Sequence, residues 1–175
     1  RDSSFVTEQS SISKNNRQVL LPSSFGIGNG AFIANEGTGS IRNGTFSKHA
    51  NEVFDIMPNG QLRFAIYDEL GNLQPSSDTM YSDAGKPAKC LWCHEINIQR
   101  PHGASTDVPG YYTINAFTAI VNQNMEILSR YRSKLVNGVD FSQRQAHTQA
   151  EFLYITFMEP SAERLAREWN KSVQE

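Results

Sequence analysis

The fold is decided by residues 53–67, VFDIMPNGQLRFAIY, in which two apolar runs flank the turn sequence Pro58-Asn59-Gly60. Short runs rich in aromatic and β-branched residues are typical of strands. An Asn-Gly pair between two such runs favours a tight hairpin turn. We therefore predict that residues 52–57 and 61–67 form an antiparallel β-hairpin.

The rest of the N-terminal half has the same character. Residues 1–89 hold nine of the twelve glycines, together with many serines and asparagines, and their apolar runs are short. This pattern is typical of small antiparallel β-structure. It predicts further strands at 18–21 and 31–34, and the polar first fifteen residues are expected to be a mobile arm.

After residue 105 the apolar residues recur at steps of three and four, the period of a helix. We predict one long helix over about 110–136, a second segment that begins at the capping-box sequence of residues 142–145, and a last helix after Pro160. The expected apolar positions of the long helix are Ile114, Phe117, Val121, Met125, Leu128, Tyr131 and Leu135, and those of the last helix are Ala162, Leu165, Ala166, Trp169 and Val173. The predicted class is therefore α+β.

The predicted organisation is a β-rich lobe over residues 1–84 followed by a mostly α-helical part over 85–175, and the two are also compatible with one compact domain. A length of 175 residues suffices for a buried core. Sixteen basic and eighteen acidic residues are spread without long runs, so we expect no nucleic-acid partner. No apolar run is long enough to predict a membrane-spanning helix.

Both cysteines lie in the pentapeptide Cys90-Leu91-Trp92-Cys93-His94. This spacing has several possible explanations besides coincidence. Two thiols three residues apart can bind the two vinyl groups of a haem, with the following histidine as the proximal iron ligand. Alternatively, Cys90, Cys93 and His94 or His102 could contribute to a structural zinc site, or the two thiols could form a redox pair. In each case the pentapeptide is the candidate functional site.

The motif resembles the haem-attachment sequence of the c-type cytochromes. This resemblance implies that Cys90 and Cys93 hold one covalent haem c and that His94 binds its iron. It also implies a mostly helical, cytochrome c-like part around the motif, export to the periplasm or the cell exterior, and electron transfer to a redox protein partner, either a separate protein or another subunit of a larger complex. The chain departs from the commonest class of that family because a Gly- and Pro-containing stretch precedes the motif.

The function of a haem c domain depends on the sixth ligand of its iron. A second protein ligand favours electron transfer, whereas an open position favours an enzyme or a gas-binding protein. Met158 is our first choice, since it precedes Pro160 and a predicted closing helix; the other candidates are Met125, His147, His102 and Met80. Lys86, Lys89 and Arg100 are candidate partners of the haem propionates.

Overall fold

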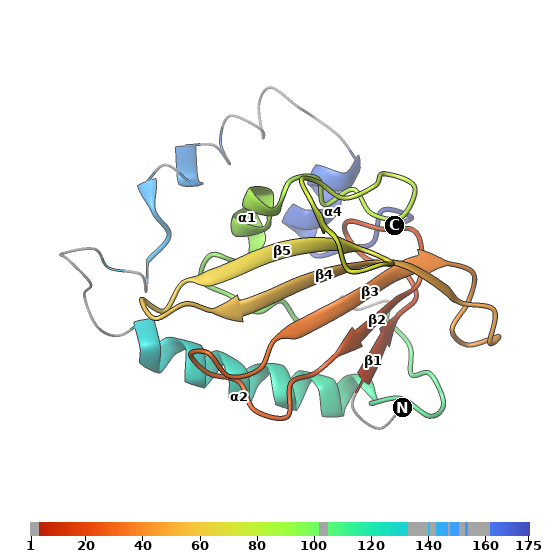
Figure 1. Ribbon diagram of the computed structural model, residues 1–175, viewed down its shortest axis with the longest axis horizontal. Helices are drawn as coiled ribbons and strands as arrows, with labels where there is room; N and C mark the ends of the chain where they lie inside the picture. The colour runs from red at the N-terminus through yellow and green to blue at the C-terminus, as the bar shows by residue number, and fades with distance from the viewer. Residues whose placement is uncertain are drawn as a thin grey trace.

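A six-stranded antiparallel sheet forms the centre of the molecule, with its strands in sequence order (Figure 1). The structure is a computed structural model that describes residues 4–101, 105–132, 140, 143–146, 148–150, 153 and 162–175. The strands are β1 (Ser4–Thr7), β2 (Arg17–Leu20), β3 (Phe32–Thr38), β4 (Ser47–Ile56), β5 (Leu62–Asp68) and β6 (Leu73–Gln74). Each strand pairs with the next, so the sheet is a simple meander.

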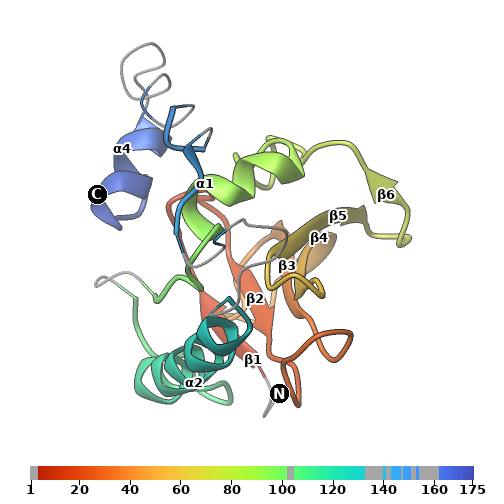
Figure 2. The same ribbon diagram turned by 90° about the vertical axis from the view of Figure 1, so that its left-hand side faces the viewer.

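The described residues also contain helical segments, of which one is long. A 3-10 turn, η1 (Pro87–Cys90), runs directly into the one-turn helix α1 (Leu91–His94); α2 (Ile114–Arg132) and α4 (Ala162–Trp169) follow later in the chain. Figure 2 shows α1 and α2 on the same side of the sheet, where ring contacts join them to it. Within the described residues, no helix is long and apolar enough to cross a membrane.

The strand register shows which side chains share the covered face. Val19 lies opposite Ala34, which lies opposite Glu52, and Phe54 lies opposite both Phe32 and Phe64. Residues paired in this way point to the same side of a sheet. We call this side, which faces α1 and α2, the inner face.

The core lies between the inner face and α2. It joins residues from both sides of the expected boundary at residue 84, namely Phe5, Phe25, Phe32, Ile56, Leu62, Ile98, Phe117, Val121 and Leu128. Phe5 of β1 stacks on Phe117 of α2 with ring centroids 4.2 Å apart, and Phe32 stacks on Phe54 at 4.8 Å. Burial of these side chains, each contributing about 1.5–3 kcal/mol, holds the helix on the sheet.

The predicted hairpin and the two predicted strands at 18–21 and 31–34 are confirmed as β4–β5, β2 and β3. The long helix is confirmed as α2, whose buried residues include the predicted Phe117, Val121 and Leu128. A last helix after Pro160 is confirmed as α4. The segment predicted to begin at residue 142 lies largely outside the described residues.

The predicted fold class is wrong in its second half. Residues 85–175 do not form a mostly helical, cytochrome c-like part; the fold is dominated by the six-stranded sheet, and α2 is a single long helix packed on it. Helical periodicity identified α2 correctly, but it could not show that its apolar face packs on the sheet rather than on other helices.

Two smaller expectations are also wrong. The first fifteen residues are not a mobile arm from residue 4 onward, because Ser4–Thr7 form β1 and the Phe5 side chain is 1% exposed. Trp169, which we expected on the buried face of the last helix, is 66% exposed. In both cases the local sequence pattern does not show which neighbouring segment packs against the residue.

Gly60 in the β4–β5 turn supplies a test of how α2 docks. Its φ is +82°, and a Cβ at this position would lie 3.2 Å from backbone atoms of Tyr131 in α2. Gly71 in the β5–β6 turn has a φ of +84° but no neighbour within 4 Å. We predict that Gly71→Ala lowers the free energy of unfolding by about 1 kcal/mol through backbone strain, and Gly60→Ala by about 2–3 kcal/mol, because crowding against α2 adds to the strain. Urea denaturation measures both, and equal losses would argue against this packing.

Candidate functional site

The pentapeptide occupies a short helical unit that lies on the inner face. Lys86 has extended backbone angles, and Pro87 then opens η1 at the position where a missing N–H is tolerated. Leu91–His94 continue as α1, so Cys90 and Cys93 are separated by about one helical turn. Both cysteines are half-buried, and they are not joined in a disulfide. Residues three apart lie on the same side of a helix, so the two thiols share one side of this unit.

His94 packs against the aromatic rings of the central strands. Its imidazole lies 5.8 Å from the ring of Phe54 and 6.0 Å from that of Phe64, centroid to centroid. Burial lowers its pKa to about 4, so the ring is neutral at physiological pH. Nδ1 lies 3.1 Å from the carbonyl oxygen of Asn97. A neutral ring that donates from Nδ1 to this carbonyl keeps the lone pair of Nε2 available for a ligand.

Cys90 lies in a less polar and more negative environment than an exposed thiol. Burial, together with the Glu52 carboxylate, raises its pKa to about 12, although Arg17 acts in the opposite direction. The side chain is therefore a protonated thiol at neutral pH. This environment does not suit a nucleophilic or redox-active cysteine, which requires a stabilised thiolate.

An ion-pair cluster lies on the inner face close to Cys90. The guanidinium of Arg17 on β2 donates from Nε to Glu36 of β3 and from Nη2 to Glu52 of β4, the latter at 2.8 Å. The side chains of these three residues are at most 15% exposed. We call Arg17, Glu36 and Glu52 the buried triad. It connects three neighbouring strands on the face that the pentapeptide covers.

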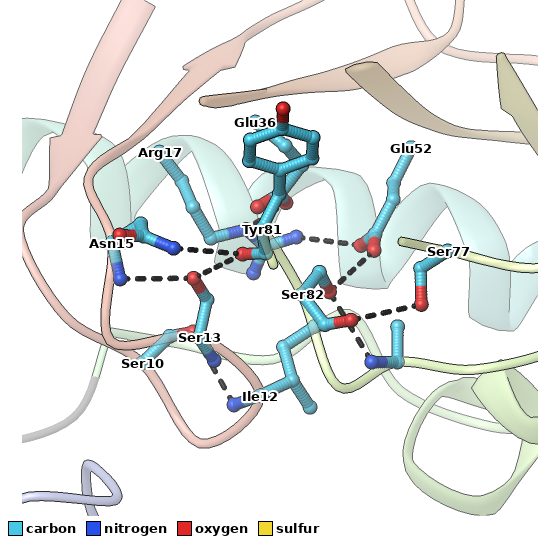
Figure 3. A network of polar contacts seen from close by, with 11 residues as sticks. Ser10, Ile12, Ser13, Asn15, Arg17, Glu36, Glu52, Ser77, Tyr81 and Ser82 are labelled. Atoms are coloured by element: carbon cyan, nitrogen blue, oxygen red, sulfur yellow. Dashed lines mark hydrogen bonds and ion pairs between the residues drawn. The ribbon is translucent and has the colours of Figure 1, made fainter. Parts of the chain in front are cut away.

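The buried triad also anchors the loop that leads into the pentapeptide (Figure 3). Ser82 donates from its hydroxyl to Glu52 at 2.7 Å, and the same oxygen accepts the backbone N–H of Ala84. Ser77 closes the loop, because its hydroxyl accepts the N–H of Gly85 at 2.7 Å and donates to the carbonyl of Ser82. The position of η1 is therefore tied to the sheet through polar contacts.

A second loop joins this network from the other side. The hydroxyl of Ser13 donates to the carbonyl of Tyr81 at 2.6 Å, and the side-chain amide of Asn15 donates to the same carbonyl (Figure 3). The Asn15 amide also donates to the carbonyl of Met80 at 2.9 Å. The segment before β2 and the segment before η1 are thus held together next to the buried triad.

Two of the candidate sixth ligands, Met125 and Met80, lie in the described residues. Met125 is half-buried in α2, and its Sδ accepts the backbone N–H of Ile98 at 2.8 Å. Met80 is 66% exposed in a turn. His102, His147 and Met158 lie outside the described residues. Among the residues that are described, no group of three or more His, Cys, Asp and Glu side chains could hold a metal ion.

The basic residues near the motif have different surroundings. Lys89 places its ammonium 5.2 Å from the centroid of the Trp92 ring, which is a cation–π contact. Trp92 is 8% exposed and contributes to the core, while Lys86 and Arg100 are exposed. The described contacts of Lys86 and Arg100 assign them no further role.

Comparison with known proteins does not add to this description, because no family model, curated protein or solved structure matches the chain. Any function must therefore be argued from the residues of the site.

Sequence reasoning identified the pentapeptide but missed the buried triad. Arg17, Glu36 and Glu52 are far apart in the chain, and each is an ordinary charged residue in a polar context. The sequence does contain a signal for the position of Glu52. It stands two residues before Phe54 and four before Ile56, so in a strand the three side chains point to the same face. Only the register shows that Arg17 and Glu36 face the same side.

Glu36 makes the stability of the protein depend on pH. Burial raises its pKa from 4.5 to about 8, Arg17 lowers it, and the neighbouring Glu52 raises it. Since the folded state holds this proton more tightly, the stabilisation is complete below pH 4.5 and is lost as the pH rises through 8. We predict that the free energy of unfolding of the wild type falls between pH 5 and 8 relative to Glu36→Gln, by about 1.4 kcal/mol per pH unit at most.

Urea denaturation at several pH values measures this difference. Glu126→Gln, at an exposed position of α2, is the matched control and is expected to follow the wild type at every pH. Parallel curves for the wild type and Glu36→Gln would contradict the assignment.

The raised pKa of Cys90 predicts slow alkylation in the protein without cofactor. In a Cys93→Ala variant, where Cys90 is the remaining cysteine, iodoacetamide at pH 8.5 should modify the folded protein at least ~100-fold more slowly than the urea-unfolded protein, because little thiolate forms. Mass spectrometry over time gives both rates. Equal rates would show that Cys90 is accessible and unperturbed.

Proposed function

We propose that this chain is a single-haem c-type electron-transfer domain in which Cys90 and Cys93 carry the haem and His94 binds its iron. The observation that carries the proposal is the state of His94. Its imidazole is neutral at physiological pH, and the Asn97 carbonyl lies 3.1 Å from Nδ1. Iron-binding histidines need this arrangement, because one nitrogen must be deprotonated and the ring must be oriented by its other nitrogen.

The chemistry of the remaining donors fits haem c. Thioether formation consumes two thiols, and Cys90 and Cys93 are cysteines outside any disulfide on one helical unit. The protonated state of Cys90 argues against the redox-pair alternative. The zinc alternative requires further ligands, and the described residues offer no cluster of three. Haem c is therefore the alternative that best uses all three residues of the motif.

The haem, when bound, supplies an iron centre that accepts and releases one electron. The protein's own residues have supporting roles in this proposal. Cys90 and Cys93 fix the position of the group, and Asn97 orients His94 through its carbonyl. Phe54 and Phe64 provide an apolar wall beside the imidazole, which excludes water and favours the neutral ring.

The proposal also includes the setting in which such a domain works. Attachment of haem c occurs after export in the family that the motif resembles, so we propose a periplasmic or extracellular location. A redox protein partner, either a separate protein or another subunit of a larger complex, would exchange electrons with the haem. The proposal does not include the cytochrome c fold.

The test is expression of the chain with a haem c maturation system, followed by a visible spectrum and a pyridine haemochrome measurement. We predict one covalent haem per chain in the wild type and complete loss of covalent haem in the Cys90→Ala, Cys93→Ala double variant. His94→Ala should change the Soret band and the spin state, because it removes the axial ligand.

His49→Ala is the matched control. The His49 ring stacks on Tyr81 with centroids 4.8 Å apart, away from the pentapeptide in sequence, and this variant should keep the wild-type spectrum. Folded wild-type protein without a Soret band would overturn the proposal. Carbon monoxide added to the reduced protein distinguishes an electron carrier from an open-site enzyme or gas-binding protein, since rapid binding indicates an open sixth position.

A further inference from the structure

A second buried arginine lies at the end of α2, outside the pentapeptide and the buried triad. Arg132 is 3% exposed, and its Nε donates to the carbonyl oxygen of Gly60 at 2.7 Å. The C-terminal end of α2 thus lies under the β4–β5 turn, as Figure 1 shows. Nη1 and Nη2 are both buried, and neither has a hydrogen-bond partner among the described residues.

Arg17 shows how this protein normally compensates a buried guanidinium. Arg17 has two carboxylates, Glu36 and Glu52, within ion-pair distance. Arg132 is as deeply buried, yet within the described chain it has one carbonyl and no ion pair. A buried charge without a counter-ion costs several kcal/mol, and burial accordingly lowers the pKa of Arg132 to about 10.

The acid that raises the pKa of Arg132, Glu95, does not complete the site. The Glu95 carboxylate raises the pKa of Arg132 but forms no ion pair with it in the described structure. Glu95 is 4% exposed; its Oε1 accepts the hydroxyl of Thr148 at 3.0 Å, and its Oε2 is buried without a partner in the part of the chain described. Nη1 and Nη2 of Arg132 therefore have no acceptor among the described residues.

We propose that Arg132 binds the carboxylate group of a ligand through Nη1 and Nη2. A guanidinium matches a carboxylate with two parallel hydrogen bonds, and such a pair is strongest where water is excluded. The carboxylate can come from a free small molecule or from a haem propionate. The second source rests on the proposed function, whereas the first does not.

The first experiment uses the protein without haem and acetate as the probe. In sodium chloride, Arg132→Met should melt within about 2 °C of the wild type or above it, because it removes an uncompensated buried charge. Arg17→Met, which leaves the carboxyl groups of Glu36 and Glu52 buried without their partner, should melt on the order of 10 °C lower. Sodium acetate of the same ionic strength should raise the melting temperature of the wild type by about 3 °C at ten times its dissociation constant, and leave Arg132→Met unchanged.

Two controls separate specific binding from general salt effects. Acetamide, the neutral analogue of acetate, should give a smaller shift, and Arg130→Gln, at an exposed position two residues away, should respond to acetate like the wild type. The side-chain NMR signal of Arg132, assigned by its absence in Arg132→Lys, should move with acetate in the wild type.

The second experiment repeats the acetate titration on haem-loaded protein and distinguishes the two sources. A response in both forms supports a free carboxylate ligand. A response in the haem-free protein that is lost on haem attachment supports a propionate as the natural occupant. If haem does not attach, the proposed function fails while the acetate result for Arg132 still stands. An equal acetate response in the wild type and Arg132→Met, or none in the haem-free protein, would overturn the inference.

Discussion

The guanidinium of Arg17, buried between Glu36 and Glu52, is the interaction on which the arrangement of the candidate site depends. An arginine cannot release its proton at physiological pH, so burying it without an acidic partner is costly. The pairing involves three neighbouring strands, and a slip of any of them by one residue would turn its charged side chain to the other face. Ser82 then links Glu52 to the loop that leads into η1. The ion pairs of the sheet and the position of the pentapeptide are therefore one connected network.

The inner face combines two environments, and His94 lies where they meet. Towards the β4–β5 turn, Phe32, Ile56 and Leu62 pack under α2, while towards the other end the buried triad lies beneath the polar loops. The imidazole of His94 stacks beside the Phe54 ring, which itself stacks on Phe32. This position accounts for the neutral state of the ring, because apolar neighbours disfavour its charged form. Burial likewise raises the pKa of Cys90, so its thiol stays protonated. The site therefore presents a neutral imidazole, as the proposed iron ligation requires, beside a protonated thiol.

Local patterns predicted individual elements better than their assembly. The hairpin around Gly60 and the helix α2 follow from turn chemistry and from periods of two and nearly four residues. The expectation of a mostly helical second half was wrong because the apolar face of α2 packs on a sheet formed by strands between residues 4 and 74. The same limit applies to β1, where two buried residues, Phe5 and Val6, stand in a polar sequence. A four-residue strand gains its stability from its partner strand, and the partner is not visible in a local window.

The sequence alone determined the candidate residues of the site, since the spacing of Cys90, Cys93 and His94 is a covalent property of the chain and does not depend on the fold. Only the tertiary structure decided the environment of these residues. Burial against Phe54 and Phe64 lowers the pKa of His94, and burial near Glu52 raises that of Cys90. The tertiary structure also brought Arg17 between two glutamates that are distant in sequence, and it left the terminal nitrogens of Arg132 without an acceptor in the described chain. The physical reason is that burial and pairing energies depend on distances in space, and residues far apart in the chain set those distances.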